Sequence, residues 1–308
     1  MNILVTGVRG QLGHDVAAEL KLRHHEVIGT DIEEMDITDL SSVTYTLTRL
    51  RPDAIIHCAA WTAVDAAQEE ENREKVFSIN RDGTANIASV CRNLNIKMMY
   101  LSTDYVFDGQ GTESWKPDCK EYHPLNIYGQ SKLEGELAVA ELERFFIIRI
   151  AWVFGKNGSN FVKTMLKLGK DHDRLRVVND QIGTPTYTRD LAKLLSDIIE
   201  TDRYGYYHAT NEGGYISWYE FAREIFRQAA ALGCEEYDEK HLTVDPVTSS
   251  EYGLSKAMRP FNSRLDKSKL SEKGFSSLPD WRDALQRYLR DILSEEYKQT
   301  KHSSSFSG

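Results

Sequence analysis

The sequence predicts an α/β fold in which helices cover both faces of a doubly wound parallel sheet. Short apolar runs, typical of buried strands, alternate with stretches of helical periodicity through the first half of the chain. The first of these runs leads directly into a glycine-rich turn. Strands that alternate with helices form right-handed crossover units, and such units build a parallel sheet.

The expected elements of the first half follow one another in strict alternation. Apolar runs predict strands at residues 2–6, 26–30, 54–58, 97–102 and 145–150. Helical periodicity predicts helices at residues 11–23, 41–51, 73–94 and 131–142. Pro52 ends the second helix, because proline cannot continue the helical hydrogen-bond ladder. We therefore assign residues 1–155 to one sheet-containing domain.

The pattern loosens after residue 155, where short strands and loops separate further helices. These helices are expected at residues 160–170, 188–200, 217–232 and 280–293. We interpret residues 156–293 as a smaller α+β region over the sheet edge, some of whose elements can return to the first domain. The polar, serine-rich residues 294–308 are expected to form a flexible tail.

Composition excludes several classes of protein. The chain of 308 residues carries 38 Lys and Arg against 47 Asp and Glu, a net charge of -9, which does not favour a nucleic-acid partner. No signal peptide and no membrane-spanning apolar run are visible, so the expected location is the cytoplasm. The four cysteines show no metal-binding spacing and are expected to be reduced: Cys58, Cys91, Cys119 and Cys234.

The glycine-rich turn predicts a binding site for a dinucleotide. Gly7, Gly10 and Gly13 lie between the first strand and the first helix, in the sequence GVRGQLG. Glycines at this spacing permit a tight turn and close approach of the backbone to a pyrophosphate, and the helix N-terminus presents free N–H groups to the anion. This context points to a Rossmann-type domain.

Asp31 ends the second strand, where a carboxylate accepts hydrogen bonds from ribose hydroxyls and repels a 2′-phosphate. Asp31 therefore favours NADH over NADPH. Arg9 lies in the glycine-rich turn and could instead pair with a 2′-phosphate. The sequence therefore allows either NADH or NADPH as the cofactor and favours NADH.

Tyr128 and Lys132 form a Tyr-x-x-x-Lys pair, which places both side chains on one face of a helix. A nearby ammonium is expected to lower the pKa of the phenol and to make Tyr128 a usable general acid near neutral pH. The pair follows about 25 residues after the strand that ends in Ser102 and Thr103. Hydroxyls at the carboxyl end of a parallel strand lie where open α/β sheets bind their ligands.

These motifs resemble those of the extended short-chain dehydrogenases and, within them, the dTDP-4-dehydrorhamnose reductase family. The resemblance extends from Met1 to about residue 293 and depends on the set of motifs in this order. Besides the glycine-rich turn and the Tyr-x-x-x-Lys pair, the set comprises STDYVFDG from Ser102, IAW at 150–152, NFVKTML at 160–166, NDQIGTPT at 179–186 and RPFNSRLD at 259–266.

The resemblance implies a role for each matching residue. It makes Thr103 the catalytic hydroxyl, Tyr128 the proton donor, and Lys132 the residue that holds the nicotinamide ribose and tunes Tyr128. The substrate-side positions are Thr103, Asp104, Tyr105 and Trp152. The glycine-rich turn and the resemblance together predict the cofactor positions Gly7, Arg9, Gly10, Gln11, Leu12, Gly13, Asp31, Asp36, Ile37, Ala59, Ala60, Trp61, Thr62, Leu101, Tyr128 and Lys132. Asn80 matches a helix asparagine that supports the lysine, and a purely structural hydrogen bond explains it equally well.

The implied reaction is reduction of the C4 ketone of dTDP-4-dehydrorhamnose to dTDP-rhamnose with NADH or NADPH. Two alternatives stay open. The chain could be a sugar-nucleotide 4-epimerase, which uses the same tyrosine, lysine and hydroxyl. It could also be a dinucleotide-binding regulatory subunit that resembles the one of methionine adenosyltransferase.

An anionic sugar nucleotide also needs a cationic anchor on this acidic chain. Arg259 is the best single candidate, because the guanidinium group suits bidentate phosphate binding and Pro260 fixes the backbone next to it. Some family members are described as metal-bridged dimers. The matching acidic positions here are Asp15, Asp190 and Asp291. These are shorter than the expected glutamates, so we assign no metal, regard Mg²⁺ as improbable, and expect a monomer or a homodimer.

Overall fold

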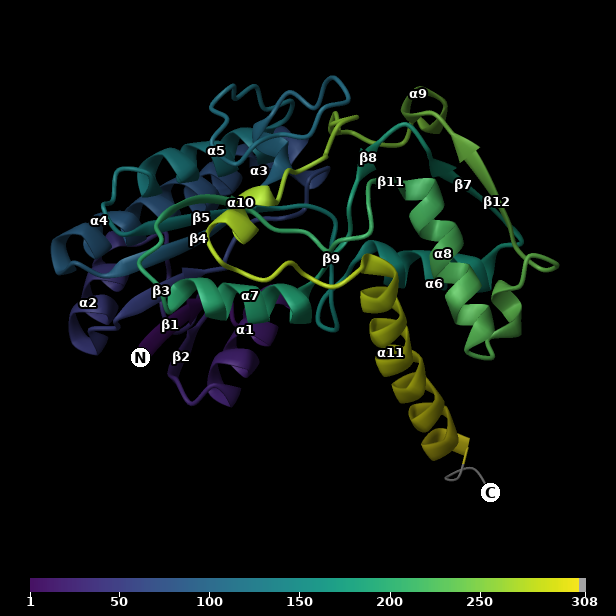
Figure 1. Cartoon of the computed structure of the whole chain (residues 1–308), viewed down its shortest axis with the longest axis horizontal. Coiled ribbons are helices and arrows are strands. Elements are labelled where there is room, and N and C mark those ends of the chain that lie inside the picture. Colours follow the sequence, from purple (N-terminus) through teal and green to yellow (C-terminus); the bar gives the residue numbers. More distant parts are fainter. Residues whose placement is uncertain (305–308) are drawn as a thin grey trace.

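The central sheet has six parallel strands, in the order β10-β5-β4-β3-β1-β2 (Figure 1). A computed structural model describes the chain from Met1 to Ser304, and the side chains as far as residue 294. The strands are β1 (Asn2–Thr6), β2 (Glu26–Thr30), β3 (Ala54–His57), β4 (Lys97–Thr103), β5 (Phe145–Ile150) and β10 (Gly205–His208). The order reverses between β1 and β3, which places the ligand-binding switch point there.

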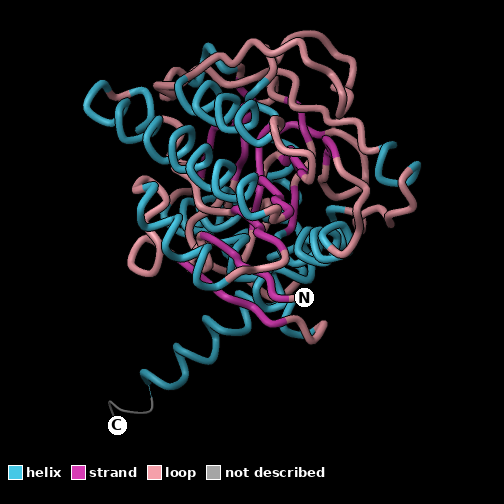
Figure 2. Tube along the Cα trace, turned by 90° about the vertical axis from the view of Figure 1, so that its left-hand side faces the viewer, coloured by secondary structure: helices cyan, strands magenta, loops and turns pink. Residues whose placement is uncertain are grey.

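Alternate side chains of each strand pack on opposite faces of the sheet, as the pleat requires. Ile3 and Val5 share one apolar core with α1 (Gln11–Leu22) and α7 (Thr188–Ile199). Leu4 belongs to the core of the other face, beneath three helices. These are α2 (Leu40–Leu50), α4 (Thr84–Leu94) and α5 (Ile127–Val139). Figure 2 shows the strands enclosed by helices, and the predicted doubly wound fold is confirmed.

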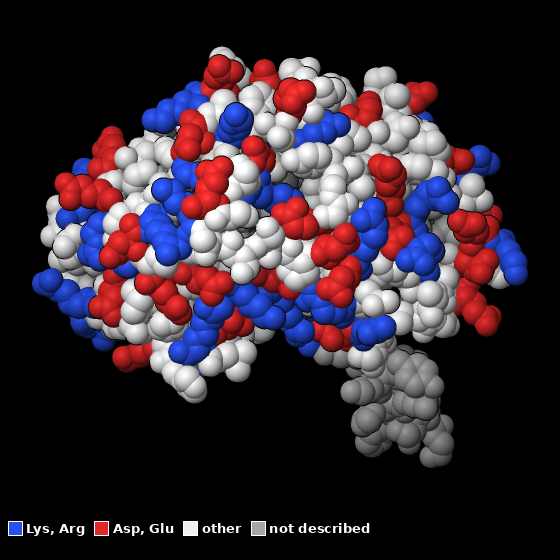
Figure 3. Space-filling view, viewed as in Figure 1, with Lys and Arg blue, Asp and Glu red and all other residues white. Residues whose placement is uncertain are grey.

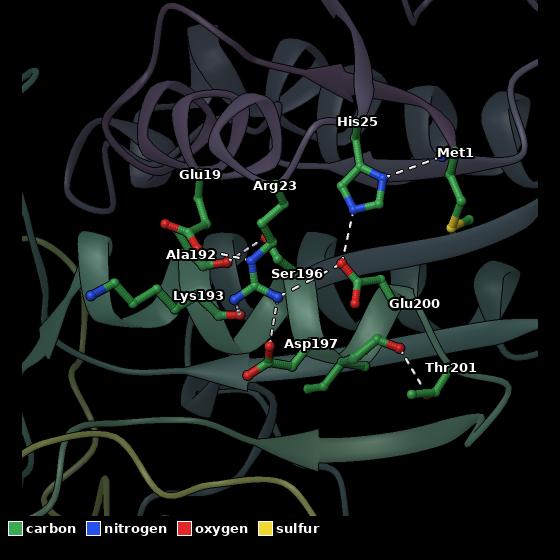
Figure 4. A network of polar contacts seen from close by, with 11 residues as sticks. Met1, Glu19, Arg23, His25, Ala192, Lys193, Ser196, Asp197, Glu200 and Thr201 are labelled. Carbon is green, nitrogen blue, oxygen red and sulfur yellow. Dashed lines mark hydrogen bonds and ion pairs between the residues drawn. The ribbon is translucent and has the colours of Figure 1, made fainter.

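A polar network fastens α7 to α1 and β2 (Figure 4). Arg23 donates from Nε to Glu19 at 2.9 Å and from Nη1 to Asp197 at 2.6 Å. His25 Nε2 lies 2.8 Å from Glu200 Oε1. Residues of the first and second halves are thereby joined at the end of α7, so the sheet domain includes part of the second half.

The C-terminal lobe surrounds a second apolar core formed mainly by three helices. They are α6 (Phe161–Asp171), α8 (Trp218–Ala231) and α11 (Trp281–Ser304). Three two-stranded sheets complete the lobe. They pair β6 (Val153–Phe154) with β9 (Thr186–Tyr187), β8 (Ile182–Gly183) with β11 (Ile216–Ser217), and β7 (Arg174–Val178) with β12 (Thr243–Val247). Two short helices, α9 (Ser249–Tyr252) and α10 (Ser268–Glu272), lie in the segment between β12 and α11.

The structure differs from the predicted elements in the long helix expected at residues 73–94. The helical run is continuous from Glu70 to Leu94, but it contains a π-helical turn (Ser78–Gly83) between α3 (Glu70–Phe77) and α4. The side chain of Asn80, within the turn, bonds to the backbone N–H and C=O of Trp61. This tertiary contact leaves no periodicity signal, so the sequence pattern cannot reveal the π-helical turn.

Two helix ends also differ. Helix α5 begins at Ile127 instead of residue 131, because the Asn126 side chain accepts from Gly129 N at 2.8 Å and caps it. Helix α11 continues to Ser304, so part of the segment expected to be a tail is helical, and residues 305–308 lie outside the described residues. Among the described residues, no helix combines the length and the apolar character needed to span a membrane.

Charged side chains are interspersed over the face shown in Figure 3, where Lys and Arg alternate with Asp and Glu. Many are paired across elements, such as Arg189 with Asp291 and Arg287 with Asp190.

Candidate active site

A cavity of about 680 Å³ opens at the carboxyl ends of the strands β1, β2, β3 and β4. Its volume lies within the usual range for small-molecule sites, about 300–1,000 Å³. Most residues predicted for the cofactor and substrate line it. They are Gly7, Gly10, Gln11, Leu12, Gly13, Asp31, Asp36, Ile37, Ala59, Ala60, Thr62, Leu101, Thr103, Asp104, Tyr105, Tyr128, Lys132 and Trp152. Three predicted residues are not part of this lining: Arg9, Trp61 and Arg259.

The glycine-rich turn has the geometry of a phosphate loop. Gly7 has a φ of 67°, and a Cβ there would approach Ala59 Cα to 2.8 Å. A Cβ at Gly13 would clash with the carbonyl oxygen of Gly7. Helix α1 begins at Gln11 without a side-chain cap, so its first amides are available to an anion.

Unpartnered polar atoms in the cavity also fit a bound dinucleotide. Thr30 Oγ1 and Ser102 Oγ are buried and have no hydrogen-bond partner among the described residues. Both residues line the cavity. Since a buried hydroxyl without a partner is unfavourable, a ligand with hydroxyl or amide groups would satisfy them.

Asp31 lies at the end of β2, where the sequence places it, but its carboxylate is already engaged. Oδ2 accepts from the backbone N–H of Arg9 at 2.8 Å. The guanidinium of Arg9 turns away to Glu33 and Glu34, at 2.8 Å and 2.7 Å. Asp31 lines the cavity, Glu33 and Glu34 do not, and the cation that could hold a 2′-phosphate is already paired with these two glutamates.

Tyr128 and Lys132 lie on α5 and reach the cavity below the end of β4. Lys132 Nζ donates to the carbonyl of Leu101 at 2.7 Å and lies 4.1 Å from the ring centre of Tyr100. Burial lowers the pKa of Lys132 to about 7, against the opposing effect of Glu136. Lys132 is therefore a lysine that changes charge near neutral pH.

The pKa of Tyr128 differs from the expectation that Lys132 lowers it. Burial raises this pKa above its usual value, Asp104 raises it further, and the Thr103 hydroxyl partly offsets the rise. Lys132 directs its ammonium to Leu101 instead, which is the physical reason for the difference. Tyr128 thus keeps its proton throughout the neutral range.

A chain of polar groups adjoins Tyr128. Thr103 Oγ1 donates to Asp104 Oδ1 at 3.1 Å and accepts from the backbone N–H of Tyr105 at 3.2 Å. Ser263, from the segment RPFNSRLD, donates to Asp104 Oδ2 at 2.5 Å. Sequence reasoning missed Ser263, because its contact with Asp104 spans 159 positions and no local pattern signals it.

Trp152 has a left-handed backbone, with a φ of 51°. This conformation is unfavourable for a bulky residue and persists only where the surroundings impose it. The indole stacks on Trp218 of α8, with ring centres 3.7 Å apart and an interplanar angle of 14°. Tyr105 contacts Tyr128 edge to face at 5.5 Å. Two aromatic residues predicted for the substrate thus flank the cavity.

Arg259 lies beside the cavity, next to Tyr105. Its guanidinium pairs with both carboxylate oxygens of Asp65, at 3.2 Å and 2.6 Å. Sequence reasoning missed Asp65, because a single aspartate in a loop carries no signal of its partner. Arg259 can therefore bind a substrate anion only by sharing or exchanging this partner.

Asn80 and Trp61 form a structural unit. Besides the two bonds to the Trp61 backbone, Asn80 Nδ2 donates to Ser131 Oγ at 3.0 Å. Among the described residues, the bonds of this side chain thus go to Trp61 and Ser131, not to Lys132. Of the two explanations for Asn80, these contacts favour the structural one.

The three acidic positions considered for a metal have other partners. Asp15 Oδ2 accepts from Thr188 at 2.5 Å, Asp190 pairs with Arg287, and Asp291 pairs with Arg189. Within the described part of the chain, no group of three or more His, Cys, Asp or Glu side chains is arranged to hold a metal.

A phosphate loop at the switch point of a parallel sheet, with a Tyr-x-x-x-Lys helix after the fourth strand, defines an extended short-chain dehydrogenase. A family model described as the RmlD substrate binding domain matches residues 1–294. The dTDP-4-dehydrorhamnose reductase of Aggregatibacter actinomycetemcomitans is 40% identical over 291 residues, which cover 92% of this chain and 96% of that protein. The chain belongs to this reductase family.

Solved structures of similar proteins belong to the same reductase family. The dTDP-4-dehydrorhamnose reductase orthologue of Clostridium acetobutylicum is 39% identical and superposes with a TM-score of 0.87, covering 96% of this chain and all of that one (100%). The dTDP-4-dehydrorhamnose reductase of Bacillus anthracis, in complex with NADP, is 38% identical with a TM-score of 0.85, covering 94% of this chain and 98% of that one.

Proposed function

We propose that the chain reduces the C4 ketone of dTDP-4-dehydrorhamnose with a reduced nicotinamide cofactor and forms dTDP-rhamnose in the cytoplasm. The observation that carries this proposal is the presence of Thr103, Tyr128 and Lys132 in the cavity that also contains the phosphate loop. A single cavity thus combines a dinucleotide site with a proton donor.

The residues divide the chemistry between them. When bound, the reduced nicotinamide supplies a hydride to the carbonyl carbon. Tyr128 protonates the developing alkoxide, and Thr103 hydrogen-bonds the same oxygen. Lys132 would hold the ribose and, in its protonated form, would keep the local field positive. The amides of α1 and the turn from Gly7 to Gly13 would hold the pyrophosphate.

An assay of the purified protein with dTDP-4-dehydrorhamnose and NADH or NADPH tests the proposal directly. We expect stoichiometric loss of nicotinamide absorbance and formation of dTDP-rhamnose. A 4-epimerase or a regulatory subunit would show no net oxidation of the cofactor. Absence of turnover in a folded protein that binds cofactor would contradict the proposal.

We further propose that the enzyme prefers NADH, because the Asp31 carboxylate lines the cavity at the end of β2 and Arg9 is paired with Glu33 and Glu34. Substitution Asp31→Asn should raise the ratio of kcat/KM for NADPH to that for NADH at least about 10-fold, or roughly 1.4 kcal/mol. The amide oxygen of asparagine can still accept from Arg9 N, so the turn should keep its shape. Steady-state kinetics with both cofactors measures the ratio.

Asp53→Asn is the matched control for Asp31→Asn. Asp53 also accepts a backbone N–H, that of Asn2 at 2.7 Å, but at the opposite end of β1. The control should leave the cofactor ratio unchanged. An unchanged ratio in Asp31→Asn as well would show that the Asp31 carboxylate does not face the 2′ position.

We propose that Arg259 binds the diphosphate of the sugar nucleotide. Substitution Arg259→Ala should raise KM for the sugar nucleotide about 10-fold and leave KM for the cofactor nearly constant. Asp65→Asn is the companion variant, because it removes the carboxylate that competes for the guanidinium, and it should not raise KM. If Arg259→Ala leaves both constants unaltered, the diphosphate is bound elsewhere.

A further inference from the structure

Asp104 is a buried carboxyl group whose two oxygens have different partners. Asp104 is 2% exposed and Ser263 is 3% exposed. Ser263 donates to Oδ2, whereas Thr103 donates to Oδ1. Because Ser263 supplies a donor to Oδ2, the proton of a neutral Asp104 belongs on Oδ1, the oxygen that faces Thr103.

The hydroxyl of Thr103 has one proton and two lone pairs, so its bonds can be counted. The backbone N–H of Tyr105 occupies one lone pair. When Asp104 is ionised, the Thr103 proton points to Oδ1, and the second lone pair is open to the phenol of Tyr128. When Asp104 is neutral, its proton fills that second lone pair. The Thr103 proton must then point towards the phenol of Tyr128, which lies within reach of this hydroxyl.

The surroundings of Asp104 suit a group that changes charge near neutral pH. Burial raises its pKa to about 6, and the donors Ser263 and Thr103 oppose this rise. Tyr105 and Tyr128 face it, and Arg259 and Asp65 lie beyond Tyr105. Lys132 lies one turn farther along α5 from Tyr128.

We propose that Asp104 supplies, through Thr103, the proton that Tyr128 gives to the substrate, and that Ser263 is a positioning residue for Asp104. This inference rests on the proposed reduction. As hydride reaches the carbonyl carbon, Tyr128 gives its proton to the alkoxide oxygen. Thr103 gives its proton to Tyr128, and Asp104 gives its proton to Thr103.

The step is balanced. The ketone becomes an alcohol, the reduced nicotinamide is oxidised, and the carboxylate of Asp104 is the remaining product. Water reprotonates Asp104 before the next turnover. The proton can therefore pass from Asp104 to Tyr128 when Asp104 is neutral. When Asp104 is ionised, the Thr103 proton points to Asp104 instead, and the hydrogen bonds run in the opposite direction.

Substitution Ser263→Ala tests the proposal without removing any reacting group. Loss of the donor to Oδ2 disfavours the ionised carboxylate, so the pKa of Asp104 should rise by about one unit. The single-turnover kcat should fall as pH rises and Asp104 ionises, and the pH midpoint of this fall should increase by the same amount. Carboxyl ¹³C NMR of the protein without ligands measures the pKa independently of activity.

Two further variants complete the design. Asp104→Asn cannot supply a proton, so it should lose the step assigned to Asp104 and lower kcat about 10-fold or more, with a smaller change in KM. The change in kcat with pH that is due to the ionisation of Lys132 should persist in every variant in which Lys132 is retained. Ser249→Ala is the matched control, because Ser249 donates to Asp180 at 2.6 Å away from the cavity, and it should change neither profile nor rate.

Several results would overturn the proposal. One is a Ser263→Ala enzyme in which the Asp104 resonance titrates at a higher pH while the kcat profile does not move. Another is a Ser263→Ala enzyme in which the Asp104 resonance titrates at the same pH as in the wild-type protein. A third is an Asp104→Asn enzyme with the wild-type rate and profile. No turnover by the wild-type enzyme would instead contradict the proposed reduction itself, so the two failures are distinguishable.

Discussion

Substitution Tyr128→Phe should lower kcat at least about 100-fold, the usual scale for losing a general acid. Phenylalanine keeps the ring that contacts Tyr105, so the cavity should keep its shape and only the proton donor is lost. Burial holds the pKa of Tyr128 above its usual value, which keeps the wild-type phenol protonated at neutral pH. Single-turnover kinetics with saturating cofactor measures the loss.

Lys132→Met is the companion to Tyr128→Phe and should differ from it in cofactor binding. Both variants should lose turnover to a similar degree, but only Lys132→Met should also weaken the cofactor, because only Lys132 is proposed to hold the ribose. Titration of cofactor fluorescence separates the two. A Tyr128→Phe enzyme with near-normal turnover would remove Tyr128 from the mechanism.

Substitution Arg149→Met should lower the free energy of unfolding by about 3–5 kcal/mol, because it leaves a buried carboxylate without its partner. Arg149 on β5 donates from Nε to Glu136 Oε1 at 2.9 Å and from Nη2 to Oε2 at 2.7 Å. The two side chains are 0% and 1% exposed. Glu136 lies one turn beyond Lys132 on α5, so this pair also anchors the helix that carries the site.

Urea unfolding measures this effect, with Arg174→Met as the matched control. Arg174 pairs with Asp245 at 2.5 Å, but its side chain is 70% exposed, so the control should lower the free energy of unfolding far less than Arg149→Met does. Equal losses in the two variants would show that burial does not govern the contribution of these pairs.

The sheet and its first-half helices could be predicted because they depend on patterns within short windows. The strand from Asn2 to Thr6 is an apolar run, and the glycines after it mark a turn that few other residues permit. The Tyr-x-x-x-Lys spacing likewise indicates one helix face. These signals identified most of the residues that line the cavity.

The remaining features depend on contacts between distant segments. The pairing of Arg9 with Glu33 and Glu34 has no periodicity, and nothing in the sequence around Arg259, the predicted anchor for the sugar nucleotide, indicates that it pairs with Asp65. Ser263 reaches Asp104 only because the C-terminal lobe folds back over the sheet. One sequence contains no record of which distant residues meet, so these contacts required the structure.

The return of β10 and α7 to the sheet has a consequence for enzyme engineering. A chimera joined near residue 155, with the whole second half taken from a relative, would exchange an edge strand and a covering helix together with the substrate region. The new α7 would have to fit the α1 of the recipient, including the partners of Arg23. Recombination should therefore retain residues 188–208 with the first half and exchange the flanking segments alone.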